Sequence, residues 1–525
     1  MMLGRPVVMG RNAAVTSGHA LASQAGLEML RAGGNAIDAA VATLAALAVL
    51  KPDACGLGSD AFLQLYDASS GRVRALNGSG AAPALATIEA YGGQLPFHGP
   101  RAPSVPGAVG AWEEALRTFG TFDLARVLAP AISYARDGMP VSLRFADALD
   151  KARDLIGRDA AYAAIFMPGG RLPRYGEVLR QHDLADMLEA IARDGAAAFY
   201  RGAFADALDA DMRARGGLMR RDDLEAYAPE WKEPLHVTYR GHDVYEQPLV
   251  SQGIIVLETV KLLEGFPLRE YGDRSADFIH VHAEAVKLAV ADRQKYLGDP
   301  AFVESPAQRM LNEDFIAARR ALISLYRSEP EPAPSDLLAG ATDTSYGCVV
   351  DAAGNAVSFI QSVFAEWGAA YVVPGTGAVM NNRMTGFSLD PQHPNALRPG
   401  KRTMHTLNTV VVCKDGRLKW VFGTPGAPAQ VQSNTQLLTR VIDFDLNPQA
   451  AIEAPRTFWA AESGLMVESP YGAGVMDELR RRGHRVSDIG KWNSITGGME
   501  MIHVNESGVR EAAADPRREG YALAY

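Results

Sequence analysis

The sequence predicts an α+β fold, with helices concentrated in the first two thirds of the chain and strands in the last third. From about residue 105 to 325 the apolar side chains have mainly helical spacing. From Thr344 onwards the pattern changes to short alternating runs separated by tight turns. Between these parts, residues 326–343 read YRSEPEPAPSDLLAGATD, a proline-rich stretch with little to pack, which is typical of a linker.

The N-terminal part begins with two predicted helices and a strand pair. Residues 21–32 have apolar side chains at helical spacing, and the Gly33-Gly34 pair stops this helix. Asn35 caps the next helix, IDAAVATLAALAVL, which is apolar nearly all round and therefore belongs inside a core. Two short strands follow, AFLQLYD and RVRALNG, joined by a turn that ends at Gly71.

The C-terminal third contains two predicted hairpins and two predicted helices. The first hairpin pairs TSYGCVVD with AVSFIQSVF around Gly354, and the second is NTVVVCKDGRLKWVFG around Asp415-Gly416. Residues 429–442 and 474–483 have helical patterns. A sheet-forming unit is therefore expected to begin at Thr344.

Composition excludes several classes of protein. The chain has 525 residues, 47% hydrophobic and 22% charged, which is a globular composition rather than a disordered or collagen-like one. At about 150 residues per domain this length suggests three or four domains, or one large fold. The net charge of −9 argues against nucleic acid as a partner. Three cysteines form neither a disulfide framework nor a four-cysteine zinc site.

No targeting or membrane segment is expected. The first 15 residues contain no long apolar core followed by a small-residue cleavage site. The longest uncharged apolar run, 39–50, is well short of the roughly 20 residues that span a bilayer. The sequence therefore predicts a cytoplasmic protein that does not bind a membrane.

Two local motifs suggest a cofactor or a metal and are set aside. Gly56-Leu57-Gly58 lacks the third glycine and the βαβ context of a dinucleotide loop. His280 and His282 are two residues apart on a predicted helix, so they point to different faces, and the sequence shows no ligand cluster around them. We therefore expect neither a metal nor an organic cofactor.

The junction Asp343-Thr344 has features that a threonine nucleophile requires. A threonine hydroxyl needs an adjacent base, and an N-terminal threonine supplies one in its own α-amine, which titrates near 8. This arrangement needs chain cleavage before the threonine, at a strand start, behind a linker, and the sequence has all three features here. The alternative is that Thr344 is simply a β-branched strand former.

Segments along nearly the whole chain carry a family resemblance. They are LASQAGLEMLRAGGNAIDAAVATLAALAVLKPDACGLGSDAF, VPGAVGAWEEA, LAPAISYARDGMPVS, EAVKLAVADR, TSYGCVVDAAGNAVSFIQS, VVPGTGAVMNNRMTGFSLD, PNALRPGKRT and GTPGA. In their order and spacing the chain resembles the γ-glutamyltransferase (glutathione hydrolase) family of N-terminal-nucleophile hydrolases. Within that family it is similar to the small glutathione-hydrolase-like proteins, oxamate amidohydrolase and the glutaryl acylases. The resemblance implies a four-layer αββα sandwich.

The resemblance also implies catalytic roles. Thr344 matches the nucleophile, and Ser362 falls where the family has a threonine that supports it. Gly426 and Ala427 match two glycines whose N–H groups form the oxyanion hole. Cleavage between Asp343 and Thr344 would give a large fragment, 1–343, and a small fragment, 344–525, which stay together as a heterodimer that could assemble further. Water or an acceptor amine would release the acyl group.

The residues that bind γ-glutamyl substrates in the family are largely replaced. Ser79 stands where the family has the arginine that clamps the α-carboxylate, and Phe364 where it has an asparagine. Arg383 and Gly386 replace a glutamine and an aspartate, and His405 and Thr406 replace paired serines. The further candidate substrate-binding or pocket-lining residues are Asn382, Tyr346, Glu366 and Trp367.

Because the acidic partner of an α-ammonium is lost and a cation is gained in Arg383, we expect an acyl group that bears a carboxylate or a carbonyl but no free α-amine. Alternatively, Arg383 forms a structural salt bridge and His405 is a packing residue. At the level of function, three hypotheses stay open. They are an amidohydrolase or acyltransferase for an oxamate- or glutaryl-type small amide, a glutathione hydrolase/γ-glutamyl transpeptidase with a rebuilt clamp, and an unprocessed non-enzymatic homologue.

Overall fold

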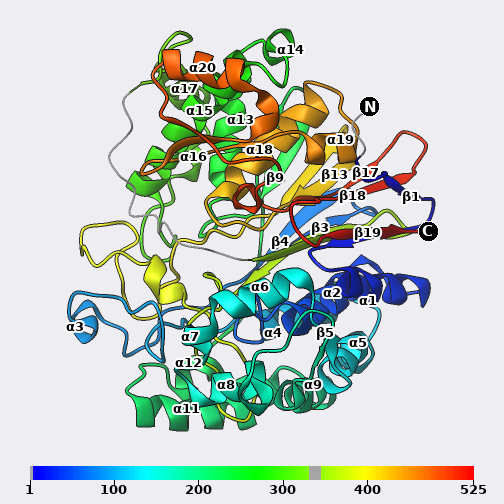
Figure 1. Cartoon of the computed structure of the whole chain (residues 1–525), viewed down its shortest axis with the longest axis vertical. Helices are drawn as coiled ribbons and strands as arrows, with labels where there is room; N and C mark the ends of the chain where they lie inside the picture. The colour runs from blue at the N-terminus through cyan, green and yellow to red at the C-terminus, as the bar shows by residue number, and fades with distance from the viewer. Residues whose placement is uncertain (1–3, 330–343) are drawn as a thin grey trace.

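Two seven-stranded sheets of antiparallel strands lie at the centre of the computed structural model, which describes residues 4–329 and 344–525 (Figure 1). The first sheet has the order β1 (Val8–Gly10), β18 (Arg510–Ala514), β17 (Glu500–Val504), β13 (Arg417–Gly423), β12 (Val410–Lys414), β9 (His242–Glu246) and β8 (Leu235–Tyr239). The second has the order β19 (Tyr521–Ala524), β2 (Ala14–Ser17), β10 (Ser345–Val350), β11 (Ala356–Ser362), β3 (Asp60–Asp67), β4 (Arg72–Gly78) and β7 (Glu230–Lys232).

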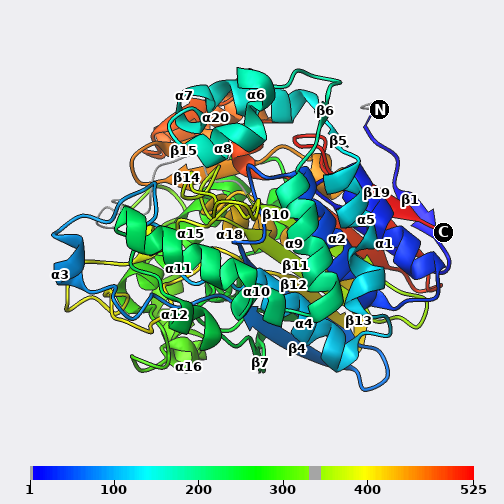
Figure 2. The ribbon, with the colours of Figure 1, turned by 90° about the horizontal axis from the view of Figure 1, so that it is seen from below.

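Helices cover the outer face of each sheet, so the molecule has four layers (Figures 1 and 2). On the second sheet lie α1 (Ala20–Arg31), α2 (Ala36–Leu50), α4 (Ala108–Phe119), α5 (Leu124–Arg136) and α9 (His182–Asp194). On the first lie α13 (Gly253–Leu263), α18 (Ala429–Ile442) and α19 (Pro448–Glu453), and α15 (Ala276–Tyr296) packs on α13. Between the sheets, Phe62 and Tyr346 share an apolar core with Val411, Val421 and Ile502. The expected α+β fold with αββα layers is confirmed.

Shorter elements complete the structure. The remaining helices are α3 (Ile88–Tyr91), α6 (Leu143–Lys151), α7 (Arg153–Ile156), α8 (Ala160–Phe166), α10 (Ala197–Tyr200), α11 (Ala203–Arg215), α12 (Arg221–Glu225), α14 (Leu268–Tyr271), α16 (Ala307–Met310), α17 (Glu313–Arg320) and α20 (Ala473–Arg481), with 3-10 turns η1 (Pro168–Gly170), η2 (Arg383–Gly386), η3 (Ser469–Tyr471) and η4 (Ser494–Thr496). The small sheets pair β5 (Met139–Pro140) with β6 (Val178–Leu179), and join β14 (Thr457–Ala460), β15 (Gly464–Val467) and β16 (Val486–Asp488).

Helix α2 is the buried helix that its alanine-rich sequence predicts. All of its residues are buried, and it packs under β10 and β11. Asn35 Oδ1 accepts hydrogen bonds from the amides of Ile37 and Asp38, while the Asp38 carboxylate accepts one from the Asn35 amide. This capping box satisfies helix N–H groups that burial would otherwise leave without acceptors. A Cβ on Gly26 of α1 would lie 2.4 Å from Thr43 Oγ1, so a glycine is needed where α1 crosses α2.

Both predicted hairpins and both C-terminal helices are confirmed, as β10–β11, β12–β13, α18 and α20. The predicted strand pair before residue 80 is β3–β4. The expectation that 105–325 is mainly helical is wrong at residues 230–246, where β7, β8 and β9 form strands. β8 ends the first sheet, and its sequence LHVTY alternates apolar and polar residues, a strand pattern that the helical interpretation of this region overlooked.

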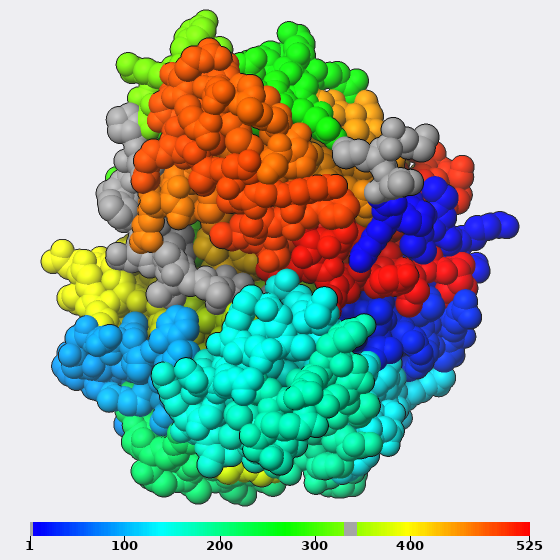
Figure 3. Space-filling view, in the orientation of Figure 1, coloured from blue at the N-terminus to red at the C-terminus, as the bar shows by residue number. Residues whose placement is uncertain are grey.

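Both sheets contain strands from before residue 330 and from after residue 343. β10 lies between β2 and β11, and β11 pairs with β3 on its other side. In Figure 3 the two parts of the chain meet along a wide contact between the lower helical layer, blue to cyan, and the red and orange C-terminal segments. Most of the predicted linker, and Asp343 of the predicted cleavage site, lie outside the described residues. Among the helices of the described ranges, none combines the length and the apolar character needed to cross a bilayer.

Candidate active site

Thr344 immediately precedes β10 and is buried with 2% of its surface exposed. Its Oγ1 donates a hydrogen bond to Ser362 Oγ at 3.0 Å. Ser362 is the last residue of β11, and its Oγ also accepts a hydrogen bond from the Phe364 amide at 2.8 Å. Because Ser345 pairs with Gln361, antiparallel register brings Thr344 opposite Ser362. The sheet itself thus places the serine beside the threonine, as the resemblance implies.

Gly426 and Ala427 lie just before Pro428, the N-cap of the 14-residue helix α18. Both have left-handed backbone conformations, with φ of +117° for Gly426 and +42° for Ala427. The Gly426 carbonyl accepts a hydrogen bond from the Ala429 amide at 2.9 Å, and the Ala427 carbonyl accepts one from Gln252 Nε2 at 3.2 Å. The dipeptide is therefore fixed at the positive end of the helix dipole, where an anion is stabilised.

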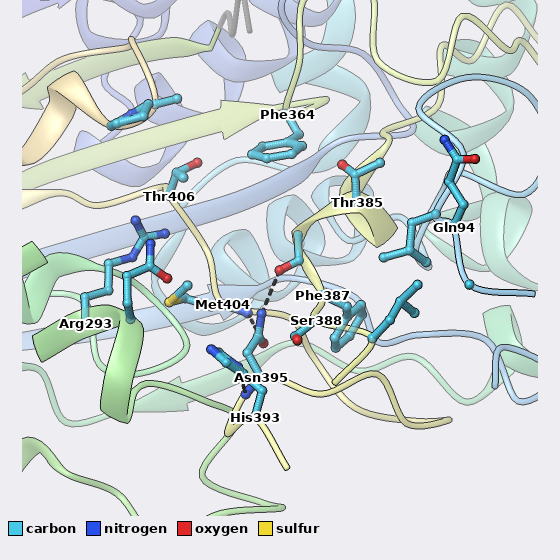
Figure 4. Close-up of a pocket in the computed structure, with 17 residues that line it drawn as sticks. Gln94, Arg293, Phe364, Thr385, Phe387, Ser388, His393, Asn395, Met404 and Thr406 are labelled. Atoms are coloured by element: carbon cyan, nitrogen blue, oxygen red, sulfur yellow. Dashed lines mark hydrogen bonds between the residues drawn. The ribbon is translucent and has the colours of Figure 1, made fainter. Parts of the chain in front are cut away.

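A pocket of about 350 Å³ opens beside this dipeptide (Figure 4). Four positions singled out from the sequence line it, namely Phe364, Gly386, Thr406 and Ala427. The other lining residues are Gly93, Gln94, Leu95, Arg293, Gln294, Thr385, Phe387, Ser388, Leu389, His393, Asn395, Met404 and Pro428. Among the described residues that line the pocket there is an arginine but no aspartate or glutamate. The lining therefore favours an anionic or neutral group over an ammonium.

Phe364 links the pocket to the predicted nucleophile. Its backbone φ is +82°, a conformation that bulky residues rarely adopt and that costs roughly 1–3 kcal/mol. The amide hydrogen bond to Ser362 Oγ and the burial of the side chain hold it there. Backbone strain of this kind concentrates at functional sites.

Asp60 forms a buried cluster on the same face of the second sheet, since it pairs in register with Ser362. Its Oδ2 lies 3.2 Å from Arg383 Nε and 3.0 Å from His405 Nε2, and its Oδ1 accepts a hydrogen bond from the Gly80 amide. Burial alone would raise the pKa of Asp60, but the hydrogen bond from His405, the charge of Arg383 and the hydrogen bond from the Gly80 amide lower it below its ordinary value.

His405 is neutral at pH 7 in this cluster. Burial, and then the nearby charge of Arg383, lower the pKa of His405 to about 4. Its Nε2–H therefore donates to Asp60, which leaves Nδ1 as an acceptor with no hydrogen-bond partner in the described part of the chain.

The sequence predicts that Arg383 binds an anionic group of the substrate, with a structural salt bridge as the alternative. The structure shows the salt bridge, which Arg383 forms with Asp60. The guanidinium carbon also lies 4.3 Å from the centroid of the Phe364 ring, a cation–π contact. Its two terminal nitrogens are buried and have no hydrogen-bond partner within residues 4–329 and 344–525. Arg383 does not line the pocket of Figure 4, and its role in binding substrate stays a prediction.

The other predicted binding or pocket-lining residues form hydrogen bonds or pack within the protein. Asn382 Oδ1 accepts from the Ala365 amide at 3.1 Å, and its Nδ2 donates to the Phe97 carbonyl. Ser79 Oγ donates to Asn77 Oδ1 at 2.6 Å. Tyr346 lies in the core between the sheets, with its hydroxyl 2.7 Å from Ser358 Oγ, and Trp367 packs in a cluster with Tyr162, Phe166 and Phe145.

The expectation that no ligand cluster accompanies His280 is wrong. His280, Glu284 and His484 hold potential metal-ligand atoms within 4.8 Å of one another. His280 Nδ1 lies 2.8 Å from His484 Nε2, and Lys287 Nζ lies 2.6 Å from Glu284 Oε1, so protein groups already partner these atoms. His282 points elsewhere, to Thr435 Oγ1 at 2.7 Å, as its spacing from His280 predicts. His484 is 204 residues from His280, a separation that sequence patterns do not bridge.

Sequence reasoning missed two residues of the site, Asp60 and Arg293. Both lie in segments that carry the family resemblance, GLGSDAF and EAVKLAVADR. A polar residue in an otherwise apolar strand run was the available signal for Asp60.

Comparison with known proteins extends over almost the whole chain. A sequence model described as gamma-glutamyltranspeptidase matches residues 22–525. The glutathione hydrolase-like YwrD proenzyme of Bacillus subtilis is 38% identical over 98% of this chain and 99% of its own. The oxamate amidohydrolase proenzyme of Klebsiella pneumoniae is 35% identical over 97% of each chain. The crystal structure of cephalosporin acylase from Bacillus halodurans superposes with a TM-score of 0.94 and 39% identity, covering 100% of this chain and 98% of that one.

Proposed function

This chain belongs to the gamma-glutamyltranspeptidase family, and on that premise we propose that it is a self-processing N-terminal-threonine amidohydrolase or acyltransferase acting on a small amide. The observation that carries the proposal is the hydrogen bond from Thr344 Oγ1 to Ser362 Oγ at the start of β10. It holds a weakly nucleophilic hydroxyl at the one junction where cleavage would also free an α-amine as its base. The names of similar proteins, which include proenzymes and acylases, support this assignment.

Processing would use the same hydroxyl. Thr344 Oγ attacks the carbonyl carbon of Asp343, the C–N bond to Thr344 breaks, the hydroxyl proton passes to the departing nitrogen, and an ester joins Asp343 to the threonine oxygen. Water then hydrolyses this ester, which yields a free carboxylate on Asp343 and a free amine on Thr344. Both fragments contribute strands to both sheets, so we expect them to stay together as a heterodimer.

Turnover would follow the same course on a substrate amide. The Thr344 amine takes the hydroxyl proton as the oxygen attacks, and the Gly426 and Ala427 N–H groups stabilise the oxyanion. The proton passes to the leaving amine, and an acyl-enzyme remains. Water or an acceptor amine then releases the acyl group and restores the threonine.

The acyl group is proposed to carry a carboxylate or a carbonyl and no α-amine, as in oxamate- or glutaryl-type amides. Two observations support this class: the described lining of the pocket contains no carboxylate to hold an ammonium, and Gly386 offers no side chain there. The charged groups that are present, in the pocket and next to it, are cationic or paired.

Intact-mass spectrometry of the purified protein tests processing. We expect two fragments, with the smaller beginning at Thr344, and a Thr344→Ala chain that stays whole. Thr342→Ala, the matched control two residues upstream, should be cleaved like the wild type. A wild-type chain that remains whole would overturn the proposal in favour of a non-enzymatic homologue.

Turnover of three substrates tests the acyl class. Processed protein should hydrolyse oxamate or a glutaryl p-nitroanilide faster than γ-glutamyl-p-nitroanilide. Efficient turnover of the γ-glutamyl compound alone would instead indicate a glutathione hydrolase with a rebuilt clamp.

A further inference from the structure

Arg293 is a buried arginine with no charged partner in the described part of the chain. It lies near the C-terminal end of α15, with 2% of its surface exposed. Its Nε has no hydrogen-bond partner, and within residues 4–329 and 344–525 its side chain takes part in no ion pair. Burial lowers the pKa of Arg293 to about 10, with no opposing contribution from a nearby carboxylate.

Two other buried arginines of this protein are paired with carboxylates. Arg456 contacts Asp515, and Arg517 contacts both Asp515 and Glu468. Burial of a cation without a partner costs desolvation free energy. A bound anionic ligand would offset this cost. Arg440 is also buried without an ion pair among the described residues, but its Nη2 donates to the Pro455 carbonyl and the Tyr471 hydroxyl, whereas Arg293 lines the pocket.

The Arg293 side chain is aimed at the pocket beside the oxyanion dipeptide. It lines this pocket together with Thr406, Phe364 and Ala427. In Figure 4 Arg293 rises from α15 and its guanidinium points towards Thr406. The rest of the lining is largely apolar or uncharged, and the described lining residues include no aspartate or glutamate to compete for the cation. An anionic group that enters the pocket would thus meet Arg293 in the cavity that Ala427 also lines.

We propose that Arg293 binds the carboxylate of the substrate's acyl group in this pocket and selects acyl groups that carry one. This role rests on the proposed amidohydrolase function, and it makes Arg293 the residue that recognises the substrate of that reaction. A planar guanidinium can offer two parallel N–H donors to a carboxylate, which adds specificity to charge. A pocket of about 350 Å³ admits a short dicarboxylic half-amide such as a glutaryl group.

Ligand-dependent thermal stability tests the proposal without depending on turnover. Glutarate is the probe and butyramide its neutral counterpart, and the protein is the full-length Thr344→Ala chain, which keeps the covalent state of the structure. Glutarate should raise the unfolding midpoint of this chain in a saturable way, while butyramide should not. Adding Arg293→Gln should weaken the apparent affinity for glutarate roughly 10- to 100-fold, and Arg293→Lys should weaken it less.

Two controls make the result specific. Arg158→Gln removes an exposed arginine and should leave the glutarate response unchanged. Without ligand, Arg293→Gln should unfold at the same or a higher temperature, because it removes an uncompensated buried charge. A lower midpoint would mean that Arg293 is a structural residue and would overturn the proposal.

Three further outcomes would also overturn the proposal. In these, glutarate leaves the unfolding midpoint of the Thr344→Ala chain unchanged, raises it equally after Arg293→Gln is added, or loses its effect only in Arg383→Gln. In processed enzyme, Arg293→Gln should raise KM for the glutaryl anilide by the same 10- to 100-fold and leave KM for a butyryl anilide within a few-fold. If the wild-type chain is not cleaved, the proposed function fails, yet the glutarate measurement still decides the role of Arg293.

Discussion

Thr344 Oγ1 lies 3.0 Å from Ser362 Oγ and donates a hydrogen bond to it. The Ser362 oxygen also accepts the Phe364 amide, so its position is fixed from two sides. With its proton engaged, the threonine hydroxyl has one preferred orientation, and its lone pairs are turned away from the serine. A positioned nucleophile of this kind reduces the entropy that the reaction must lose.

Ser362→Ala should slow both processing and turnover while the chain stays folded. The substitution removes the acceptor for Thr344 Oγ1 and leaves the Phe364 amide unpaired. A misplaced nucleophile of this kind commonly loses about 100-fold in rate. The rate of fragment appearance by mass spectrometry and kcat on a glutaryl anilide measure the effect. Ser362→Thr keeps the hydroxyl and should restore most of both rates, and equal rates in wild type and Ser362→Ala would contradict the role.

Ala427→Gly should be tolerated, and Ala427→Val should not. At φ of +42° the alanine Cβ is strained by roughly 1–2 kcal/mol, which glycine avoids, while glycine loses about 0.5–1 kcal/mol through greater unfolded-state freedom. The free energy of unfolding should therefore change by less than about 1 kcal/mol, and kcat by only a few-fold. A β-branched valine would shift the backbone and misplace an oxyanion donor, with a loss of about 100- to 1000-fold in kcat. Activity of the valine variant close to wild type would rule out this N–H as a donor.

Much of the secondary structure could be predicted because its signals are local. The hairpin β10–β11 shows apolar strands on both sides of Gly354, whose φ of +90° suits the turn. The capping of α2 by Asn35 is likewise visible within four residues. Strand β8 was missed although Leu235, Val237 and Tyr239 alternate with His236 and Thr238, because five residues give a weak signal beside the longer helical patterns around them.

The site could be predicted only in part, because its partners are distant in the chain. Thr344, Ser362 and the 426–427 dipeptide were placed by resemblance. Asp60 meets Arg383 across 323 residues and His405 across 345, which no spacing rule connects. What marks Arg293 is a buried guanidinium that lines the pocket and forms no ion pair within the described residues, a combination that only a folded structure reveals.

Asp60→Asn should destabilise the protein by about 3–5 kcal/mol, because it leaves the buried Arg383 without a counter-charge. Urea unfolding of the uncleaved Thr344→Ala chain measures this free energy. Adding Arg383→Gln to Asp60→Asn should recover a large part of the loss, since the cation that lacked a partner is gone. Asp67→Asn, at the far end of β3, is the matched control and should cost about 1 kcal/mol or less. Simple additivity of Asp60→Asn and Arg383→Gln would show that the two side chains are not coupled.

Stability should fall as the pH drops below about 6.5, and His282 provides a clean test. It is buried, bonds Thr435 Oγ1, and has its pKa lowered to about 3 by burial and then by the charge of Arg440. Between pH 6.5 and 3 the unfolded chain binds a proton at this residue that the folded chain does not. The free energy of unfolding therefore decreases with falling pH by about 1.4 kcal/mol per pH unit from this one group, and above pH 6.5 the contribution is constant.

His282→Gln keeps a side chain that can bond Thr435 but cannot titrate. In urea unfolding of the Thr344→Ala chain at pH 6, 5 and 4, this variant should show a slope smaller by about 1.4 kcal/mol per pH unit. His236→Gln, at an exposed position of β8, controls for the substitution itself. Parallel pH profiles for His282→Gln and its parent would mean that His282 is protonated in the folded protein. Its ring would then have to be reached by water, against the packing of α15 on α18.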